Sequence, residues 1–204
     1  MIENTDYSFY IGDVETTGLS LGDSEIIELS LIRLNDEAQK TWLLKATKPD
    51  KIDLGALRVN GHKYDDITHK SKLGKDNYKE PSQVIVEIEN WLLEDNVSTI
   101  NRILCGQNVA FDHYMMQWLW KDNNATDSFP FSRRMLDTMQ IEMFMDLANN
   151  SSLKEGYSLA NLAKKYGVKN EKAHSAAADT LATKEILKKQ IEFANKVFNK
   201  TLTD

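Results

Sequence analysis

The sequence predicts a mixed α/β domain, and three features of the residue pattern support this prediction. Residues 7–14 and 25–34 are rich in aromatic and branched aliphatic residues, and the turn between them contains two glycines, as between neighbouring antiparallel strands. From residue 81 onward, apolar residues recur at helical spacing. Short strand-like runs alternate with these helices, which indicates a sheet that is covered by helices.

The segment after these two strands begins with a third expected strand and then becomes polar. Residues 41–47 complete a three-stranded antiparallel meander, because the connection before them is short. Residues 48–80 contain several glycines and lysines and show no strong period, except for a short helix expected over 54–59. A stretch of this length without regular structure is usually functional or mobile.

The second half of the chain is predicted to alternate between helices and short strands. Pro81 and Ser82 are residues that commonly begin a helix, and the apolar residues that follow them share one helical face. Gly167 is expected to end a later helix, as glycine often does. Helices are expected over residues 81–94, 111–121, 137–147, 158–166 and 175–198, and strands over 101–105 and near 135–136.

Length and composition are those of a single soluble domain. The chain has 204 residues, 41% of them hydrophobic and 27% charged, which suits one domain over residues 1–204 with a core over about 7–198. Cys105 is the only cysteine, so an internal disulfide framework is excluded and a reducing compartment is favoured. The first residues form no basic and apolar leader, and no run of about 18 apolar residues occurs. We therefore expect a cytoplasmic protein without a membrane span.

The net charge of −6 argues against a protein that coats nucleic acid by bulk electrostatics. An enzyme that binds nucleic acid locally is not excluded. Acidic residues concentrated at a metal site make the total charge negative while the surrounding rim stays basic. The charge alone therefore does not decide between function classes.

Two carboxylates end the first predicted strand with a single residue between them. Asp13 and Glu15 flank Val14, and side chains two residues apart on a strand point to the same face. The two anions repel each other, and their removal from water costs further free energy. Either they lie at a solvated strand end, or a positive group binds between them.

Further acidic residues occur where predicted elements join. Asp112 lies in the first turn of a helix that directly follows a strand, where the helix dipole also favours a carboxylate. Asp137 has a similar position, and we interpret it mainly as a helix cap. Asp179 lies one turn inside the last helix. If Ser175 is the N-cap of that helix, His174 lies outside it and can reach the same place as Asp179.

These carboxylates suit a site for divalent cations. Magnesium and manganese prefer hard oxygen ligands, and carboxylates from separate elements are their usual protein ligands. Two such ions about 3.5–4 Å apart activate a water and stabilise the leaving oxygen of a phosphodiester. Bound cations would cancel the repulsion between Asp13 and Glu15.

With the four acidic positions and the histidine assembled, the chain resembles the DEDDh family of 3′–5′ exonucleases, which includes the proofreading subunits of bacterial replicative polymerases. The resemblance spans residues 8 to about 188 and implies the ribonuclease-H-like fold, a mixed five-stranded sheet (three antiparallel strands, then two parallel) flanked by helices. The motifs that carry it are Asp-Val-Glu-Thr-Thr-Gly at 13–18, Asn-Val-Ala-Phe-Asp at 108–112 and His-Ser-Ala-Ala-Ala-Asp at 174–179.

The resemblance also implies two divalent metal ions, Mg²⁺ or Mn²⁺, and a role for each motif residue. Asp13 would contact both ions, and Glu15 and Asp179 would bind the ion that carries the attacking water. Asp112 would hold the second ion, directly or through water. His174 would take the proton from the attacking water, and histidine titrates close to neutral pH, which suits a general base.

Substrate contacts are implied at the turn after the acidic pair, at the Asn-Gly loop and in the second motif. Leu19 would wedge against the terminal base, and His62 follows the Asn-Gly loop. Apart from such a contact, His62, His69 and His113 are expected to be solvated. The implied set comprises Thr16, Thr17, Gly18, Leu19, Asn60, Gly61, His62, Asn108 and Phe111.

The leading functional interpretation is a metal-dependent 3′–5′ exonuclease that acts on the 3′ ends of single-stranded nucleic acid and releases nucleoside 5′-monophosphates. DNA is favoured, because the Glu-Thr-Thr-Gly-Leu turn most resembles the proofreading group. One alternative is an exoribonuclease that acts on RNA 3′ ends or short oligoribonucleotides, and another is a non-catalytic module that binds nucleic acid. The resemblance allows a polymerase or another replication or repair protein as a partner.

Overall fold

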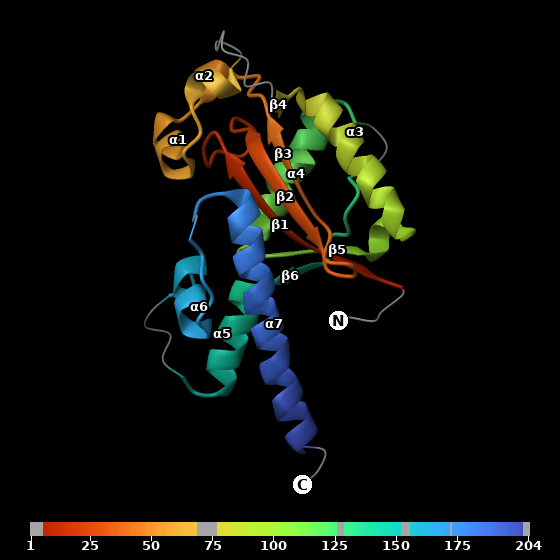
Figure 1. Ribbon diagram of the computed structural model, residues 1–204, viewed down its shortest axis with the longest axis vertical. Coiled ribbons are helices and arrows are strands. Elements are labelled where there is room, and N and C mark those ends of the chain that lie inside the picture. Colours follow the sequence, from red (N-terminus) through yellow and green to blue (C-terminus); the bar gives the residue numbers. More distant parts are fainter. Residues whose placement is uncertain (1–5, 69–76, 126–128, 152–155, 172, 202–204) are drawn as a thin grey trace.

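The computed structural model describes residues 6–68, 77–125, 129–151, 156–171 and 173–201. Within these residues, six strands form a mixed sheet in the order β4-β3-β2-β1-β5-β6, with helices on both faces (Figure 1). The predicted α/β class is confirmed. The elements are β1 (Ser8–Thr16), β2 (Ile26–Arg33), β3 (Gln39–Leu44), η1 (Pro49–Lys51), α1 (Leu54–Asn60), α2 (Tyr64–Ile67), β4 (Tyr78–Lys79), α3 (Pro81–Leu92), η2 (Leu93–Asp95), η3 (Thr99–Asn101), β5 (Arg102–Gly106), α4 (Ala110–Asp122), β6 (Met135–Asp137), α5 (Thr138–Ala148), α6 (Leu159–Tyr166) and α7 (Ala176–Thr201).

Strand pairing follows the predicted topology with one added strand. Strands β1, β2 and β3 form an antiparallel meander, while β5 pairs parallel to β1 and β6 parallel to β5. The sheet has six strands in the described part of the chain rather than the expected five, because β4 pairs parallel to the end of β3. A strand of only two residues has too short a period to be recognised in the sequence.

The two faces of the sheet bury different residues, as the alternation of side chains along a strand requires. Tyr10 and Val14 of β1 pack with α3 and α4 in one hydrophobic core, where the ring of Trp91 meets Tyr10 edge-on with centroids 5.6 Å apart. Ile11 lies on the opposite face, in a core that includes Leu187 of α7. Asp13 and Glu15 share the face of Ile11, because they follow it at intervals of two residues.

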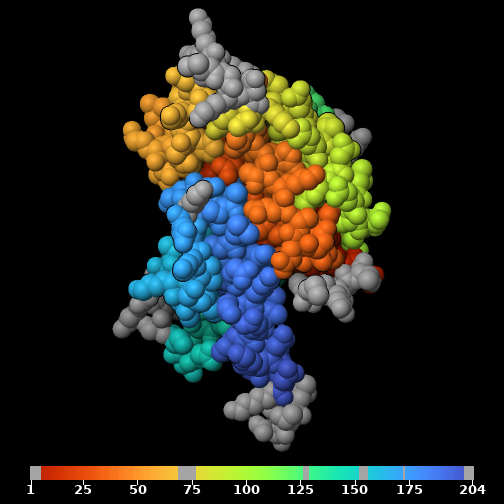
Figure 2. Space-filling view, in the orientation of Figure 1, coloured from red at the N-terminus to blue at the C-terminus, as the bar shows by residue number. Residues whose placement is uncertain are grey.

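Helix α7 runs along this second face and continues beyond the sheet (Figure 1). Its first half contacts β1 and β2, and α5 and α6 pack beside it. In the space-filling view, α7 borders the surface formed by β2 and β3 (Figure 2). No helix within the described ranges is long and apolar enough to cross a membrane.

The polar segment 48–80 is more regular than its sequence pattern suggested. The expected short helix is present as α1, and Asp53 caps it by accepting a hydrogen bond from the backbone N–H of Gly55. Leu57 of α1 and Ile67 of α2 pack on Ile27 in a small core of their own. Helices α1 and α2 thereby lie beside the end of the sheet where β1 terminates (Figure 1).

Candidate active site

Three of the predicted carboxylates converge at the end of β1. Asp13 and Glu15 point from the same face of the strand, and Asp179 approaches them from the first turns of α7. One carboxylate oxygen from each residue lies within 4.8 Å of the corresponding oxygens of the other two. Residues 166 positions apart in the sequence therefore form one acidic cluster, with all donor atoms oxygen.

Asp112, from the first turn of α4, contacts the same strand. It is buried, with 5% of its surface exposed, and its Oδ1 accepts a hydrogen bond of 3.0 Å from the backbone N–H of Val14. This bond attaches the start of α4 to β1 between the two motif carboxylates. Asp112 does not belong to the 4.8 Å group, but its charge acts on Asp13.

A glycine permits the close approach of α4 to β1. A Cβ atom at Gly106, the last residue of β5, would lie 3.0 Å from the backbone oxygen of Gly12 and 2.9 Å from a methyl carbon of Val109. Any larger residue would push β5 away from β1 or displace the start of α4. Gly106 therefore helps to set the position of Asp112.

Burial and mutual repulsion raise the pKa values in this cluster. Removal from water, followed by the charges of Asp112, Asp179 and Glu15, raises the pKa of Asp13 well above its ordinary value. Burial and the charges of Asp179 and Glu28 raise the pKa of Glu15 to about 7. Burial also raises the pKa of Asp112, against the hydrogen bond from Val14. These shifts favour the protonated carboxyl groups as long as no cation is bound.

The metal-free protein should therefore lose stability as the pH rises. A raised pKa means that the folded state holds its proton more tightly than the unfolded chain, so this contribution is complete below the ordinary pKa of glutamate, 4.5, and is lost as the pH passes about 7. Because Glu15 is partly exposed, we expect it to change the free energy of unfolding by about 1–2 kcal/mol between pH 4.5 and 8. Urea unfolding in EDTA measures this change.

The matched control for this prediction is Glu15→Gln, which keeps the shape of the side chain and removes its titration. The fall in the free energy of unfolding with pH should be shallower in the variant, and saturating Mn²⁺ should flatten it in the wild type. If the free energy of unfolding in EDTA falls equally with pH in wild type and variant, titration of Glu15 does not cause the loss of stability.

His174 lies beside Asp179 and outside α7, as expected for the residue before the N-cap position. Its side chain is exposed and its backbone has φ 67°, a left-handed conformation that histidine adopts more readily than most residues. Its backbone N–H donates to Oδ2 of Asp179 at 3.1 Å, and the amide of Asn170 donates to Oδ1 at 2.6 Å. Asp179 thus holds the loop that presents His174.

Ser175 occupies the N-cap position directly before α7, as expected, and the carboxylate of Glu28 of β2 also binds this helix start. Its Oε1 accepts hydrogen bonds from the hydroxyl of Ser175 and from the backbone N–H of Ala177, both at 3.2 Å. Sequence reasoning missed Glu28, which lies directly opposite Glu15 in the β1–β2 register. The available signal was a polar residue at alternating spacing within a hydrophobic strand.

Two of the histidines that were expected to be solvated, His62 and His113, have side chains shielded from water, and His69 lies outside the described residues. The ring of His62 lies between Glu28 and Tyr78, with Nε2 3.1 Å from the Glu28 carboxylate and Nδ1 2.7 Å from the Tyr78 hydroxyl. Both ring nitrogens are therefore used inside the protein, which disfavours the predicted substrate contact of His62. His113 is buried in α4, and its Nε2 lies 3.0 Å from the backbone oxygen of Ser132.

The predicted turn residues use their polar groups to shape the turn. The hydroxyl of Thr16 donates to the backbone oxygen of Gly18 at 2.6 Å, and the hydroxyl of Thr17 accepts from the backbone N–H of Glu25. Asn60 donates to the backbone oxygen of Thr16 at 3.1 Å, which brings the Asn-Gly loop to the end of β1. Leu19 projects from this turn with 82% of its surface exposed, and Gly61 ends α1 with φ 75°.

The remaining predicted positions belong to the start of α4. Asn108 has φ 56°, and its backbone N–H donates to Asp137. Asp137 also accepts from the backbone N–H of Met139, so its interpretation as a helix cap is confirmed. Phe111 is partly buried against the core on the α3 and α4 face.

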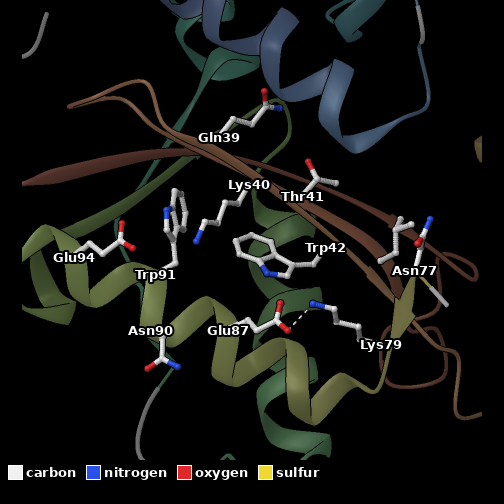
Figure 3. Close-up of a pocket in the computed structure, with 11 residues that line it drawn as sticks. Gln39, Lys40, Thr41, Trp42, Asn77, Lys79, Glu87, Asn90, Trp91 and Glu94 are labelled. Carbon is white, nitrogen blue, oxygen red and sulfur yellow. Dashed lines mark hydrogen bonds and ion pairs between the residues drawn. The ribbon is translucent and has the colours of Figure 1, made fainter.

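One hollow in the described surface lies away from the acidic cluster. It has a volume of about 870 Å³ and lies between β3 and α3, beside Trp42 and Trp91 (Figure 3). An ion pair between Lys79 and Glu87 crosses it, with 2.6 Å between the charged atoms. None of the predicted site residues lines this hollow, so its size does not mark it as the site of chemistry.

A family model described as an exonuclease matches residues 11–187. The chain belongs to the exonuclease family. This exonuclease chain is 26% identical over 194 residues to the PolC-type DNA polymerase III of Lacticaseibacillus paracasei, which covers 95% of this chain and 12% of the polymerase. The corresponding polymerase of Staphylococcus haemolyticus is 25% identical over 185 residues, or 91% of this chain and 11% of the polymerase. The chain thus spans about an eighth of the length of these relatives.

Solved structures of nucleases have the same fold as this exonuclease chain. The zinc-bound complex of E. coli exonuclease I with single-stranded DNA has a TM-score of 0.70 and 17% identity, covering 97% of this chain and 43% of that chain. Cell-death related nuclease 4 has a TM-score of 0.72 and 15% identity, covering 93% of this chain and 65% of that chain. The predicted fold is confirmed, and the family match confirms the predicted exonuclease class of enzyme.

Proposed function

We propose that this exonuclease domain hydrolyses phosphodiester bonds from the 3′ end of single-stranded DNA in a metal-dependent reaction and releases nucleoside 5′-monophosphates. The observation that carries the proposal is the cluster of Asp13, Glu15 and Asp179, whose carboxylate oxygens lie within 4.8 Å of one another in a chain of the exonuclease family. A bound cation would offset the repulsion between these three carboxylates.

The donor set fits hard divalent cations such as Mg²⁺ or Mn²⁺. All donor atoms are carboxylate oxygens, supplied by β1 and α7. The raised pKa values of Asp13 and Glu15 support a site that needs positive charge. Asp13, Glu15 and Asp179 would hold one ion, and Asp112 with Asp13 a second. Bound ions would supply Lewis acidity toward the scissile phosphate and the attacking water.

The residues of the chain would then orient the reactants and transfer the proton. His174, on the exposed loop beside Asp179, would accept a proton from the attacking water at an imidazole nitrogen. Asp179 holds the backbone of His174 in place. The turn after β1, with exposed Leu19 at its tip, would contact the terminal nucleotide. A contact between Leu19 and the face of a base does not depend on the hydrogen-bonding groups of that base. It therefore suits a nuclease that degrades strands of arbitrary sequence.

DNA is the proposed substrate for two reasons. The relatives that align with almost the whole chain are DNA polymerases, and a structural neighbour is described in complex with single-stranded DNA. The chain aligns with only 12% of a polymerase of this kind, so the partner proposed is a replication or repair protein such as a polymerase. A cytoplasmic location is part of the same proposal and agrees with the single buried cysteine, Cys105.

Degradation of matched oligonucleotides tests the proposed substrate. With 5′-labelled single-stranded DNA and RNA of one sequence in Mn²⁺ or Mg²⁺, we expect a ladder of products that shorten only from the 3′ end, with faster loss of DNA. Addition of EDTA should stop the reaction. Faster loss of RNA would replace this proposal with an exoribonuclease, and inactivity on both strands with every metal would favour a binding module. Internal cleavage would contradict exonuclease action.

A further inference from the structure

Glu28 attaches the first turn of α7 to the sheet. Its Oε1 accepts hydrogen bonds from Ser175 and Ala177, at the start of the helix. A carboxylate at a helix N-terminus is favoured by the helix dipole and satisfies backbone N–H groups that have no partner within the helix. His174 immediately precedes this turn and Asp179 immediately follows it, so Glu28 fixes the part of α7 that presents both.

The second carboxylate oxygen of Glu28 is held from the other side by His62. His62 Nε2 lies 3.1 Å from Oε2 of Glu28, and His62 Nδ1 lies 2.7 Å from the hydroxyl of Tyr78. A neutral imidazole satisfies both contacts if Nε2 donates to the carboxylate and the Tyr78 hydroxyl donates to Nδ1. The side chains of His62 and Glu28 are only 7% and 9% exposed, so these bonds are shielded from water.

Without its hydrogen bonds to the start of α7 and to His62, Glu28 would lie at an electrostatically unfavourable position. It lies opposite Glu15 in the strand register, and its charge repels Glu15 and Asp13. Burial raises the pKa of Glu28, but the hydrogen bonds from His62, Ala177 and Ser175 outweigh burial and lower it overall. The carboxylate is therefore kept ionised by the groups that it connects, beside a cluster that already holds too much negative charge.

We propose that Glu28 and His62 are positioning residues for the proposed metal site. Together they connect the segment that contains α1 and β4 to the start of α7, and they hold His174 and Asp179 over Asp13 and Glu15. Neither residue contacts the reacting atoms. This inference rests on the proposed function. It assigns His62 a structural role, the support of Glu28 beside the site, in place of the predicted contact with substrate.

Three variants test this arrangement. Glu28→Ala removes the cap, Glu28→Gln keeps an oxygen that accepts from Ser175 and Ala177, and His62→Ala removes only the support behind Glu28. We expect Glu28→Ala to lower kcat or the affinity for Mn²⁺ alone by about 10- to 100-fold, the range typical of residues that orient metal ligands. The KM for single-stranded DNA should stay nearly unchanged. His62→Ala should give a smaller loss of the same kind, and Glu28→Gln should recover most of the activity.

Hydrogen exchange provides a readout that needs neither metal nor substrate. In EDTA, the amides of residues 175–180 should exchange faster in Glu28→Ala and His62→Ala than in the wild type, while amides of β1 keep their protection. If the wild-type protein cleaves neither DNA nor RNA, the proposed function fails, but exchange rates and Mn²⁺ affinity still decide whether Glu28 and His62 position α7.

The matched control is Asp95→Asn, which disturbs a buried ion pair with Arg102 outside the site, where the charged atoms are 2.8 Å apart. It should lower the melting temperature and leave kcat, Mn²⁺ affinity and exchange at 175–180 unchanged when measured well below melting. Wild-type Mn²⁺ affinity, kcat and exchange in both Glu28→Ala and His62→Ala would overturn the proposal. Losses in Glu28→Gln as large as in Glu28→Ala would also overturn it, because the retained oxygen would then have no effect.

Discussion

Replacement of Asp13 by asparagine is expected to abolish cleavage and to stabilise the metal-free protein. Asp13 shares the 4.8 Å cluster with Glu15 and Asp179, and the charge of Asp112 also acts on it. It is therefore the residue proposed to contact both ions. Loss of its charge should remove several kcal/mol of transition-state stabilisation, or about 10³-fold in rate or more. Rates of single-turnover cleavage of a labelled DNA strand measure the loss.

The same substitution should raise the free energy of unfolding in EDTA at pH 8. Asparagine has the shape of aspartate but removes one of several buried charges that repel each other, so we expect a gain of about 1–3 kcal/mol. Saturating Mn²⁺ should reverse the order, because only the wild type gains stability by binding the ion. Urea unfolding with and without Mn²⁺ measures both effects.

Asp137→Asn is the matched control for Asp13→Asn. Asp137 is also a buried aspartate at a strand end, but it accepts hydrogen bonds from Asn108 and Met139, and an asparagine oxygen can accept both. Its cleavage rate should stay near that of the wild type. Wild-type cleavage by Asp13→Asn, or equal losses in both variants, would contradict the proposed role of Asp13.

The acidic motif residues were predictable because each has a local signal. Asp13 and Glu15 follow a strand at an interval of two, which fixes their common face regardless of the rest of the fold. Asp112 and Asp179 each lie within the first turns of a helix. Local signals do not show that these elements converge, but the order of the motifs predicts it. The 4.8 Å cluster of Asp13, Glu15 and Asp179 agrees with this prediction.

The groups behind the cluster could not be predicted because they depend on long-range register. Glu28 is one polar residue in a hydrophobic strand. Its role depends on its position opposite Glu15 and on its hydrogen bond from the backbone N–H of Ala177. His62 and Tyr78 come together only because β4 adds to the sheet edge. Neither the two-residue strand nor the pairing of a loop histidine with a buried glutamate leaves a periodic signal.

The sheet face beneath α7 is polar near the site and apolar farther along, and this division has a physical reason. Ser30 is fully buried opposite Asp13, where it is 3.2 Å from the hydroxyl of Thr180 and accepts a hydrogen bond from Thr41. Buried polar groups of this kind need specific partners, so they allow one placement of α7 rather than several. An apolar interface alone would permit the small shifts that a metal site does not tolerate.

Replacement of His174 by asparagine is expected to cost about 10²- to 10⁴-fold in cleavage rate, the usual contribution of a general base. Asparagine is a better choice than alanine, because His174 has φ 67° and asparagine tolerates this conformation. The backbone hydrogen bond from residue 174 to Asp179 can then persist, so the substitution removes the imidazole without releasing the loop. Mn²⁺ affinity should therefore stay close to that of the wild type.

The pH dependence of single-turnover cleavage separates a base from a structural residue. In the wild type, cleavage should fall on acidification, because a general base acts only in its unprotonated form. His174→Asn should lack this imidazole-dependent fall and regain activity steadily as the pH rises, because hydroxide replaces the missing base. If the variant cleaves at the wild-type rate, or loses rate and Mn²⁺ affinity together with an unchanged pH profile, His174 acts by holding Asp179 rather than by accepting the proton.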